Sequence, residues 1–333
     1  MTRNVLIKEV AKYLPPTVVN NDYYIKHFDQ RNIKSRGLYE AVGRDKRHIV
    51  KNNEENTYTM GLEAAKTLLA QSDISIEDID MLVFVSDSPE FLAPTTALTL
   101  RENLGAINAH MVFDMNQNCT GMVAGLDVVA QYLKTKKYLN KALVVSSFYG
   151  SLMAEKDSDP VSHGCLSDGA SAVLLEVEES DIERGIIDSS YLTNSETCNL
   201  MVFPAAGLSK LHEPSVPMKD KKMYYGYEEA DFLGHDTITG LTKLLKQNDL
   251  SPDHINHYLV SQFESAIIDE VAEAFNQPKE KFVTTMADLG YVGNSSPIFA
   301  FEKLVQNGVT DGDLAVVSSV GAGYIVSSIL YKF

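Results

Sequence analysis

The sequence predicts an α/β fold built from two similar halves, and three observations support this prediction. Short apolar runs of strand length alternate with helical stripes, which is typical of a parallel or mixed sheet covered on both faces by helices. The stretch 71–86 resembles 247–262, which lies 176 positions later. The stretch 141–147 resembles 313–319, which lies 172 positions later. Two matches at nearly equal spacing indicate a duplicated unit with a seam near residue 180.

The elements of the first half follow from the spacing of apolar residues. Helices are expected where apolar residues recur every three or four positions, and strands where a short run is apolar throughout. The expected order is a strand at 5–10, a helix at 59–70, a strand at 81–85, a helix at 93–104, a strand at 111–113, a helix at 121–133 and a strand at 142–146. The polar and aromatic stretch 20–48 should form short helices and surface loops.

The duplication predicts elements of the second half. A strand at 315–318 should correspond to the one at 142–146, and the helix that precedes it should begin near Gly293 and Asn294. The segment 193–234 has weak periodicity and a tyrosine-rich run, and it is too long for a simple connection. A cap over a pocket, a dimer contact and an irregular surface excursion remain open for it.

Composition limits the classes of function. The net charge of −16 and the pI near 4.9 argue against nucleic acid or an anionic membrane as the principal partner. No apolar run is long enough for a membrane span, and three cysteines without a C-x-x-C pair indicate no metal site. We therefore expect a soluble cytoplasmic protein. The basic cluster 44–48 is either a solvated face or a contact for a phosphorylated ligand or carrier protein.

Cys119 lies where a predicted strand passes into a predicted helix. It belongs to the stretch 114–126, D-M-N-Q-N-C-T-G-M-V-A-G-L. A thiol at a helix start meets unpaired backbone N–H groups and the positive end of the helix dipole, which lower its pKa and favour a nucleophilic thiolate. A buried structural cysteine is the alternative. The neighbours Asn118, Thr120 and Gly121 suit a tight turn, so Cys119 is the candidate nucleophile.

Five further segments join this turn in a resemblance to one family. They are G-R-D-K-R-H-I (43–49), S-P-E-F-L-A-P-T-T-A (88–97), S-D-G-A-S-A-V (167–173), G-N-S-S (293–296) and G-A-G-Y (321–324). Together they resemble, in order, the motifs of β-ketoacyl-ACP synthase III of the thiolase superfamily. The resemblance implies a thiolase fold, duplicated and five-layered (α-β-α-β-α), with two central helices. It implies an N-terminal half at 1–180 that carries the nucleophile and a C-terminal half at 181–333.

The resemblance also implies roles for individual residues. Cys119 matches the cysteine that is acylated, and its backbone N–H together with that of Gly323 matches the oxyanion hole. Asn294 matches the asparagine that hydrogen-bonds the malonyl thioester oxygen, with a helix N-cap as the alternative. Because the duplication places Cys119 and Asn294 at the start of corresponding helices, we expect them to converge on a pocket between the halves.

Gln262 departs from the family pattern. It stands in the segment 258–265, Y-L-V-S-Q-F-E-S, where the family has a histidine. Glutamine can donate a hydrogen bond to an oxyanion, but it cannot serve as an imidazole acid or base. We therefore expect Gln262 to be a neutral oxyanion donor in an enzyme whose acylation survives while its decarboxylation weakens.

Substrate recognition departs from the family as well. Gly37 and Ala41 occupy the positions of the tryptophan and arginine that grip the adenine of coenzyme A in the family, and Pro160 occupies that of a further arginine. Arg44 and Arg47 remain the candidate contacts for the thioester substrate. An acyl-CoA or acyl-ACP is expected as substrate, with no permanently bound cofactor.

The expected function is an acyl-thioester-dependent condensing enzyme of lipid or secondary metabolism, which moves an acyl group from Cys119 to a malonyl- or β-keto-type thioester. One alternative is an acyltransferase that acts on an oxygen, nitrogen or carbon nucleophile without decarboxylation. The other is a weakly catalytic partner subunit, against which the retention of Cys119, Asn294 and the glycine turn argues. A homodimer, or a heterodimer with a homologue, joined through 108–113 is expected.

Overall fold

A computed structural model describes residues 1–226 and 232–333. Residues 227–231 lie outside this description, and they include Tyr227, the last residue of the tyrosine-rich run in the 193–234 segment. Within the described ranges, no helix has both the length and the apolar character needed to cross a membrane.

The described strands form one large sheet and two small ones. The large sheet has nine described strands in the order β11-β12-β13-β8-β1-β7-β6-β4-β5. Its strands are β1 (Thr2–Tyr13), β4 (Met81–Val85), β5 (Met111–Met115), β6 (Lys141–Tyr149), β7 (Asp168–Ser180), β8 (Gly185–Thr193), β11 (His257–Leu259), β12 (Leu314–Gly321) and β13 (Ile325–Lys332). The small sheets pair β2 (Val18–Asn20) with β3 (Lys46–His48), and β9 (Met201–Val202) with β10 (Tyr224–Tyr225).

Strand pairing repeats in the two halves, which confirms the predicted duplication. In the first half β4 is parallel to β6, and β6 is antiparallel to β7. In the second half β11 is parallel to β12, and β12 is antiparallel to β13. The two sequence matches paired β4 with β11 and β6 with β12, and the structure adds β7 and β13 to the repeat.

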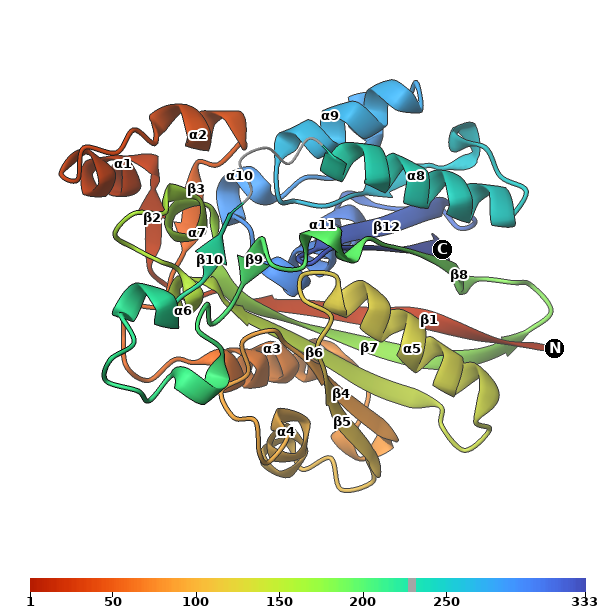
Figure 1. Ribbon diagram of the computed structural model, residues 1–333. Helices are drawn as coiled ribbons and strands as arrows, with labels where there is room; N and C mark the ends of the chain where they lie inside the picture. The colour runs from red at the N-terminus through yellow and green to blue at the C-terminus, as the bar shows by residue number, and fades with distance from the viewer. Residues whose placement is uncertain (227–231) are drawn as a thin grey trace.

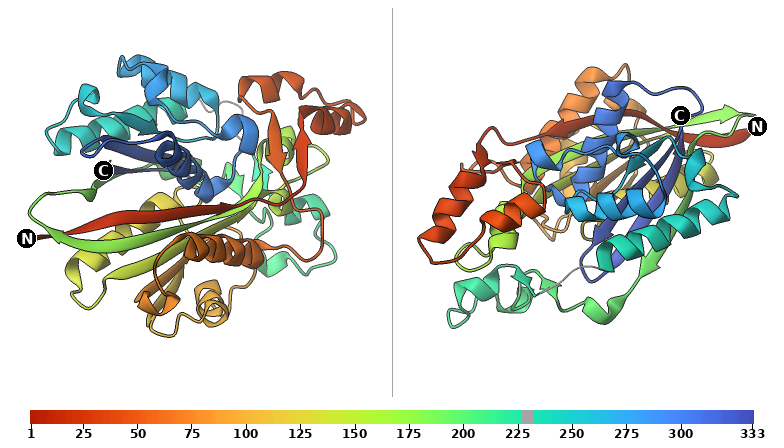
Figure 2. Two further views of the ribbon diagram at one scale, coloured as in Figure 1. Left: turned by 180° about the vertical axis from the view of Figure 1, so that it is seen from behind. Right: turned by 90° about the horizontal axis from the view of Figure 1, so that it is seen from above.

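The helices lie in three layers around the sheet, as Figures 1 and 2 show. On one outer face, α3 (Thr57–Gln71) packs on β1, β6 and β7, with α4 (Thr96–Leu104) beside it. On the opposite outer face, α8 (Phe232–Gln247) packs on β8, β12 and β13 and against α9 (Ser265–Ala274). Between them α5 (Gly121–Thr135) and α11 (Ser296–Asn307) contact strands of both halves. This is the expected five-layered arrangement with two central helices.

The apolar core follows the layers. The largest cluster of buried side chains surrounds α5 and α11, and separate clusters lie under α3 and α4 and under α8 and α9. Helix α5 has ten buried residues out of fifteen, which matches its apolar character on nearly every face. This apolar character suits a helix between the two halves, and only its last turns, at Gln131, Tyr132 and Thr135, reach the surface.

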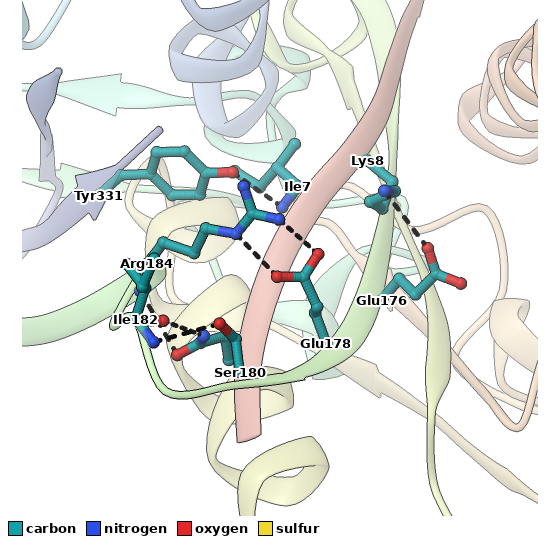
Figure 3. A network of polar contacts seen from close by, with 9 residues as sticks. Ile7, Lys8, Glu176, Glu178, Ser180, Ile182, Arg184 and Tyr331 are labelled. Atoms are coloured by element: carbon teal, nitrogen blue, oxygen red, sulfur yellow. Dashed lines mark hydrogen bonds and ion pairs between the residues drawn. The ribbon is translucent and has the colours of Figure 1, made fainter. Parts of the chain in front are cut away.

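The proposed seam near residue 180 falls in the turn between β7 and β8, which Figure 3 shows at close range. Arg184 closes this turn through a bidentate ion pair with Glu178. Across the seam the backbone N–H of Ile7 in β1 donates to the hydroxyl of Tyr331 in β13, at 3.1 Å. Polar contacts as well as the shared core thus join the halves, while the exact domain boundary stays a proposal.

Several boundaries differ from the sequence prediction, and two of these differences have a local cause. Helix α4 begins at Thr96 and not at 93, because the carboxylate of Asp114 accepts the N–H groups of Thr96 and Ala97 and so starts the helix there. Where a helix was expected to begin near Gly293 and Asn294, a short 3-10 turn at Gly293–Ser295 precedes α11. Pro297 occupies the first turn of α11, where its missing N–H costs no hydrogen bond.

The remaining helices are short. The stretch 20–48 forms α1 (Asn21–Asp29) and α2 (Arg36–Ala41), as expected, together with β2 and β3. Three others are α6 (Gly150–Met153), α7 (Pro160–Cys165) and α10 (Met286–Leu289). Single 3-10 turns occur at Ile76–Asp78, Ser195–Thr197, Leu208–Lys210, Met218–Lys221, Pro252–His254 and Lys279–Lys281.

Candidate active site

Cys119 lies in the turn between β5 and α5, at the junction of the two halves. Asn118 adopts a left-handed conformation (φ 51°), which asparagine tolerates better than most residues. Its side-chain amide donates to the carbonyl of Ala322 at 2.7 Å, and the hydroxyl of Ser319 donates to the carbonyl of Cys119 at 3.1 Å. The end of β12 in the second half therefore holds the cysteine turn of the first half.

A pocket with an empty volume of about 400 Å³ opens beside Cys119. Its lining is almost wholly apolar or aromatic and comes from both halves. The lining residues are Cys119, Met201, Tyr225, Phe232, Leu233, Phe263, Tyr291, Val320, Gly321, Ala322 and Tyr324. This volume includes space that is open to solvent, and an apolar pocket beside a nucleophile suits an acyl chain. Met201 and Tyr225 belong to the 193–234 segment, so part of that segment does border the pocket.

The expected lowering of the Cys119 pKa is wrong for this structure. Burial, and then the negative charge of Asp87, raise the pKa of the thiol to about 12. A hydrogen bond from Tyr291 and the backbone N–H groups of Ala322 and Cys119 act in the opposite direction. Desolvation outweighs these donors because the side chain is only 5% exposed. The free thiol is therefore neutral and needs a proton acceptor to react.

Gly323 lies between the lining residues Ala322 and Tyr324. Its φ of +110° is a conformation that side chains with a Cβ rarely adopt, and the space where a Cβ would stand is open. This turn faces the cysteine turn through the bond between Asn118 and Ala322. An oxyanion hole formed by Cys119 and Gly323 remains a proposal that this arrangement supports.

Asn294 lies next to the nucleophile helix but is not part of the pocket lining. It is fully buried, and neither atom of its amide has a hydrogen-bond partner among the described residues. A Cβ placed on Gly121 would stand 3.9 Å from the Cβ of Asn294, so the starts of the two central elements are close. An unpartnered buried amide is costly, and a ligand is one means of satisfying it. The role predicted for Asn294 stays a prediction.

Gln262 directs its amide toward backbone groups. Its NH₂ donates to the carbonyls of Val260 (2.9 Å) and Val283 (3.2 Å), and its oxygen accepts the N–H of Thr285 at 2.8 Å. Both hydrogens of the NH₂ are thus in use. To serve as an oxyanion donor, as predicted, Gln262 would have to give up one of these bonds. The neighbouring Phe263 lines the pocket.

Arg44 and Arg47, the candidate contacts for the thioester substrate, are both buried. Arg44 donates to the carbonyls of Cys165, Val42 and Phe263. Arg47 donates to the carbonyl of Gly164 and the side chain of Asn21. Burial lowers the pKa of Arg44 to about 10, and that of Arg47 is lowered as well. Both arginines here hold surrounding loops together, and a substrate contact would require rearrangement.

Two residues beside Cys119 were not expected from the sequence. Tyr291 lines the pocket and hydrogen-bonds the cysteine sulfur, and Asp87 lies close enough to influence the pKa of both. Asp87 follows a buried strand by two residues, and polar groups at the carboxyl ends of parallel strands often form sites. The sequence could therefore have indicated Asp87 as a site residue. For Tyr291, the only indication in the sequence is its closeness to the 293–296 motif.

Comparison with known proteins places the chain in a family. A family model for the C-terminal part of 3-oxoacyl-(acyl-carrier-protein) synthase III matches residues 245–333, and one for 3-oxoacyl-(acyl-carrier-protein) synthase III matches 113–195. Together they match more than half of the chain. The chain belongs to the 3-oxoacyl-ACP synthase III family.

Curated relatives of this synthase III family match over nearly their full length. The β-ketoacyl-ACP synthase III of Lactococcus lactis is 27% identical, with 93% of each chain covered. That of Chlorobium chlorochromatii is also 27% identical, with 98% of each chain covered. The protein described here is therefore a distant relative of both.

Solved structures agree on the fold. The 3-oxoacyl-ACP synthase III of Aquifex aeolicus superposes with a TM-score of 0.84 at 20% identity, covering 99% of this chain and 100% of that one. The priming β-ketosynthase of a polyketide biosynthetic pathway superposes with a TM-score of 0.87 at 20% identity, covering 100% of this chain and 97% of that one. These similarities establish the thiolase fold.

Proposed function

We propose that this protein is an acyl-thioester-dependent condensing enzyme of fatty acid, polyketide or related metabolism. In this proposal Cys119 accepts the acyl group from an acyl-CoA or acyl-ACP and passes it to a malonyl- or β-keto-type thioester. The observation that carries the proposal is the position of Cys119, which opens onto an apolar pocket at the start of a central helix. Membership of the synthase III family supports the same class of reaction.

The pocket supports an apolar acyl group as the portion that is transferred. Its lining includes the apolar side chains of Met201, Phe232, Leu233 and Phe263. Burial of apolar surface contributes about 25 cal/mol per Å², so a longer chain should bind more tightly until it fills the pocket. An ionised acyl group would lose its hydration without a described cation in the lining to replace it.

Intact-protein mass spectrometry tests the first half of the reaction. The protein is incubated with acyl-CoAs and acyl-ACPs of increasing chain length, beside a Cys119→Ser variant. We expect a mass increase equal to one acyl group in the unaltered protein and none in the variant. Acylation at another residue, or in the variant, would contradict the assignment of Cys119.

Release of carbon dioxide tests the second half. The acylated protein is given malonyl-CoA or malonyl-ACP, and both release and the chain-extended product are measured. Decarboxylation with product formation supports a condensing enzyme. Acylation without either result, in the unaltered protein and in a Gln262→His variant alike, would favour acyl transfer to another nucleophile.

A further inference from the structure

Tyr291 and Cys119 line the same pocket and belong to the same cluster of buried side chains. The side chains of Tyr291 and Cys119 share a hydrogen bond that favours the thiolate. The backbone carbonyl of Tyr291 accepts the N–H of Ser167 at 2.8 Å. Its ring packs edge-on against Phe263 and Phe148, with centroids 5.2 and 6.5 Å away. Because its backbone is hydrogen-bonded and its ring packs against two aromatic side chains, the hydroxyl is preorganised as a donor.

Asp87 reaches the same place from a neighbouring strand. Strands β4 and β5 are parallel, with Val85 opposite Met115, and the N–H of Ser86 donates to the carbonyl of Met115 at 3.1 Å. Asp87 and the cysteine turn therefore leave the sheet at one edge. The Oδ1 atom of Asp87 is buried and has no hydrogen-bond partner in the described parts of the chain. It is free to take a proton.

The electrostatic surroundings suit proton acceptance by this carboxyl. Burial raises the pKa of Asp87 to about 7, so it is half ionised near neutral pH. Its charge raises the pKa of both Cys119 and Tyr291, whereas the buried Arg44 acts on Tyr291 in the opposite sense. The pKa of Tyr291 remains well above its usual value, so its hydroxyl keeps its proton. It can donate to the sulfur but cannot accept the proton of the thiol.

We propose that Tyr291 and Asp87 complete the acyl-transfer site of Cys119, an inference that rests on the proposed function. Asp87 takes the thiol proton as the sulfur bonds to the acyl carbon, and Tyr291 donates its hydrogen bond to the sulfur as negative charge develops. The carbon–sulfur bond of the donor thioester breaks, and Asp87 returns the proton to the leaving thiolate. Atoms and electrons balance without a further reactant.

A Tyr291→Phe variant tests the hydrogen bond while it keeps the ring packing. The matched control is Tyr258→Phe, since Tyr258 is equally buried but donates to the carbonyl of Pro252 away from the pocket. We expect Tyr291→Phe to slow acylation of Cys119 about tenfold to a hundredfold, at an unchanged melting temperature. The control should acylate at the unaltered rate. An unaltered rate in Tyr291→Phe would overturn the role of Tyr291.

The pH dependence of the acylation rate in the unaltered protein tests whether Asp87 is the base. With Asp87 as base, the rate should rise through about pH 7 and level off above pH 8, because the carboxylate is then fully formed. A mechanism that relies on free thiolate would instead keep rising toward pH 10, because the thiol pKa is about 12. That result would refute the base. It needs no variant, so it stands even if substitution of Asp87 prevents folding.

An Asp87→Asn variant separates two explanations of the role of Asp87, a base or only a charge that repels the thiolate. The two explanations predict opposite changes in the acylation rate. Loss of a base should slow acylation about a hundredfold, and the acylation rate should no longer level off above pH 8. If the carboxylate only repels the thiolate, its removal lowers the thiol pKa and the variant becomes faster. A faster variant would overturn the proposal for Asp87.

Alkylation separates failure of this inference from failure of the proposed function. In a Cys198→Ser background, which removes the exposed cysteine, iodoacetamide should modify Cys119 about tenfold more slowly after Tyr291→Phe. This comparison needs no acyl donor. If no thioester acylates the protein, the proposed function fails while alkylation still decides whether Tyr291 supports the sulfur. Equal alkylation rates would refute the hydrogen bond itself.

Discussion

At the scale of single residues, the site is determined by where polar groups direct their hydrogen bonds. Gln262 and Tyr291 illustrate this. The first uses its whole amide to join the end of β11 to the backbone at 283–285, and the second directs its hydroxyl to the cysteine sulfur. A buried polar side chain contributes to stability through such bonds, and only a group aimed at the pocket can contribute to the reaction.

Replacement of Gln262 should therefore act on stability. In Gln262→Ala, two carbonyls and one N–H lose their partner, which should lower the free energy of unfolding by about 2–3 kcal/mol. Acylation of Cys119 should stay near the unaltered rate. Urea denaturation and mass spectrometry measure the two effects.

A matched control is Gln277→Ala, since Gln277 is also buried and donates to Asp253 and to the carbonyl of Phe275. It should lose stability without a change in acylation. If Gln262→Ala alone reduced turnover a hundredfold while acylation was intact, Gln262 would be the oxyanion donor that the sequence predicts.

At the scale of elements, the start of α5 depends on close contact with β4. A Cβ added to Gly121 would stand 2.7 Å from the Cγ1 of Val85, a distance at which the helix or the strand must move. Cys119 precedes this contact by two residues. The position of the sulfur thus depends on the absence of a side chain at Gly121. Packing against Val85 requires glycine there, although glycine is otherwise unfavourable in a helix.

Gly121→Ala should destabilise the protein by about 1–3 kcal/mol through overpacking and should slow acylation, since the cysteine turn shifts. Adding Val85→Ala removes the methyl groups in contact, so the double variant should lose less than the sum of the single losses. Urea denaturation of all four proteins measures this coupling. Gly37→Ala, where the space for a Cβ is open, serves as the control. Strict additivity would contradict the proposed contact.

At the scale of the whole molecule, β5 forms one end of the large sheet. All five of its residues are only half-buried, although Met111, Phe113 and Met115 pack on the central core and Val112 packs on the core under α3 and α4. An edge strand presents unpaired backbone groups, which another copy of the sheet can satisfy. The predicted contact at 108–113 overlaps this strand.

We expect a dimer joined through β5, with a mass about twice 36.8 kDa. Light scattering over a series of micromolar concentrations measures it. A heterodimer with a homologue would appear only after mixing the two chains. A monomer mass throughout the series, with the protein still folded, would contradict a homodimer.

The sequence by itself determined the main helices and strands from β1 to β6, the duplication and the place of Cys119 between strand and helix, because these depend on local apolar spacing and its repetition. Only the tertiary structure decided the chemistry around the sulfur. Tyr291 reaches Cys119 from the other half of the chain, and burial outweighs the hydrogen bonds of the turn in setting the thiol pKa. Desolvation and hydrogen bonds between distant residues arise from packing in three dimensions, which local patterns do not contain.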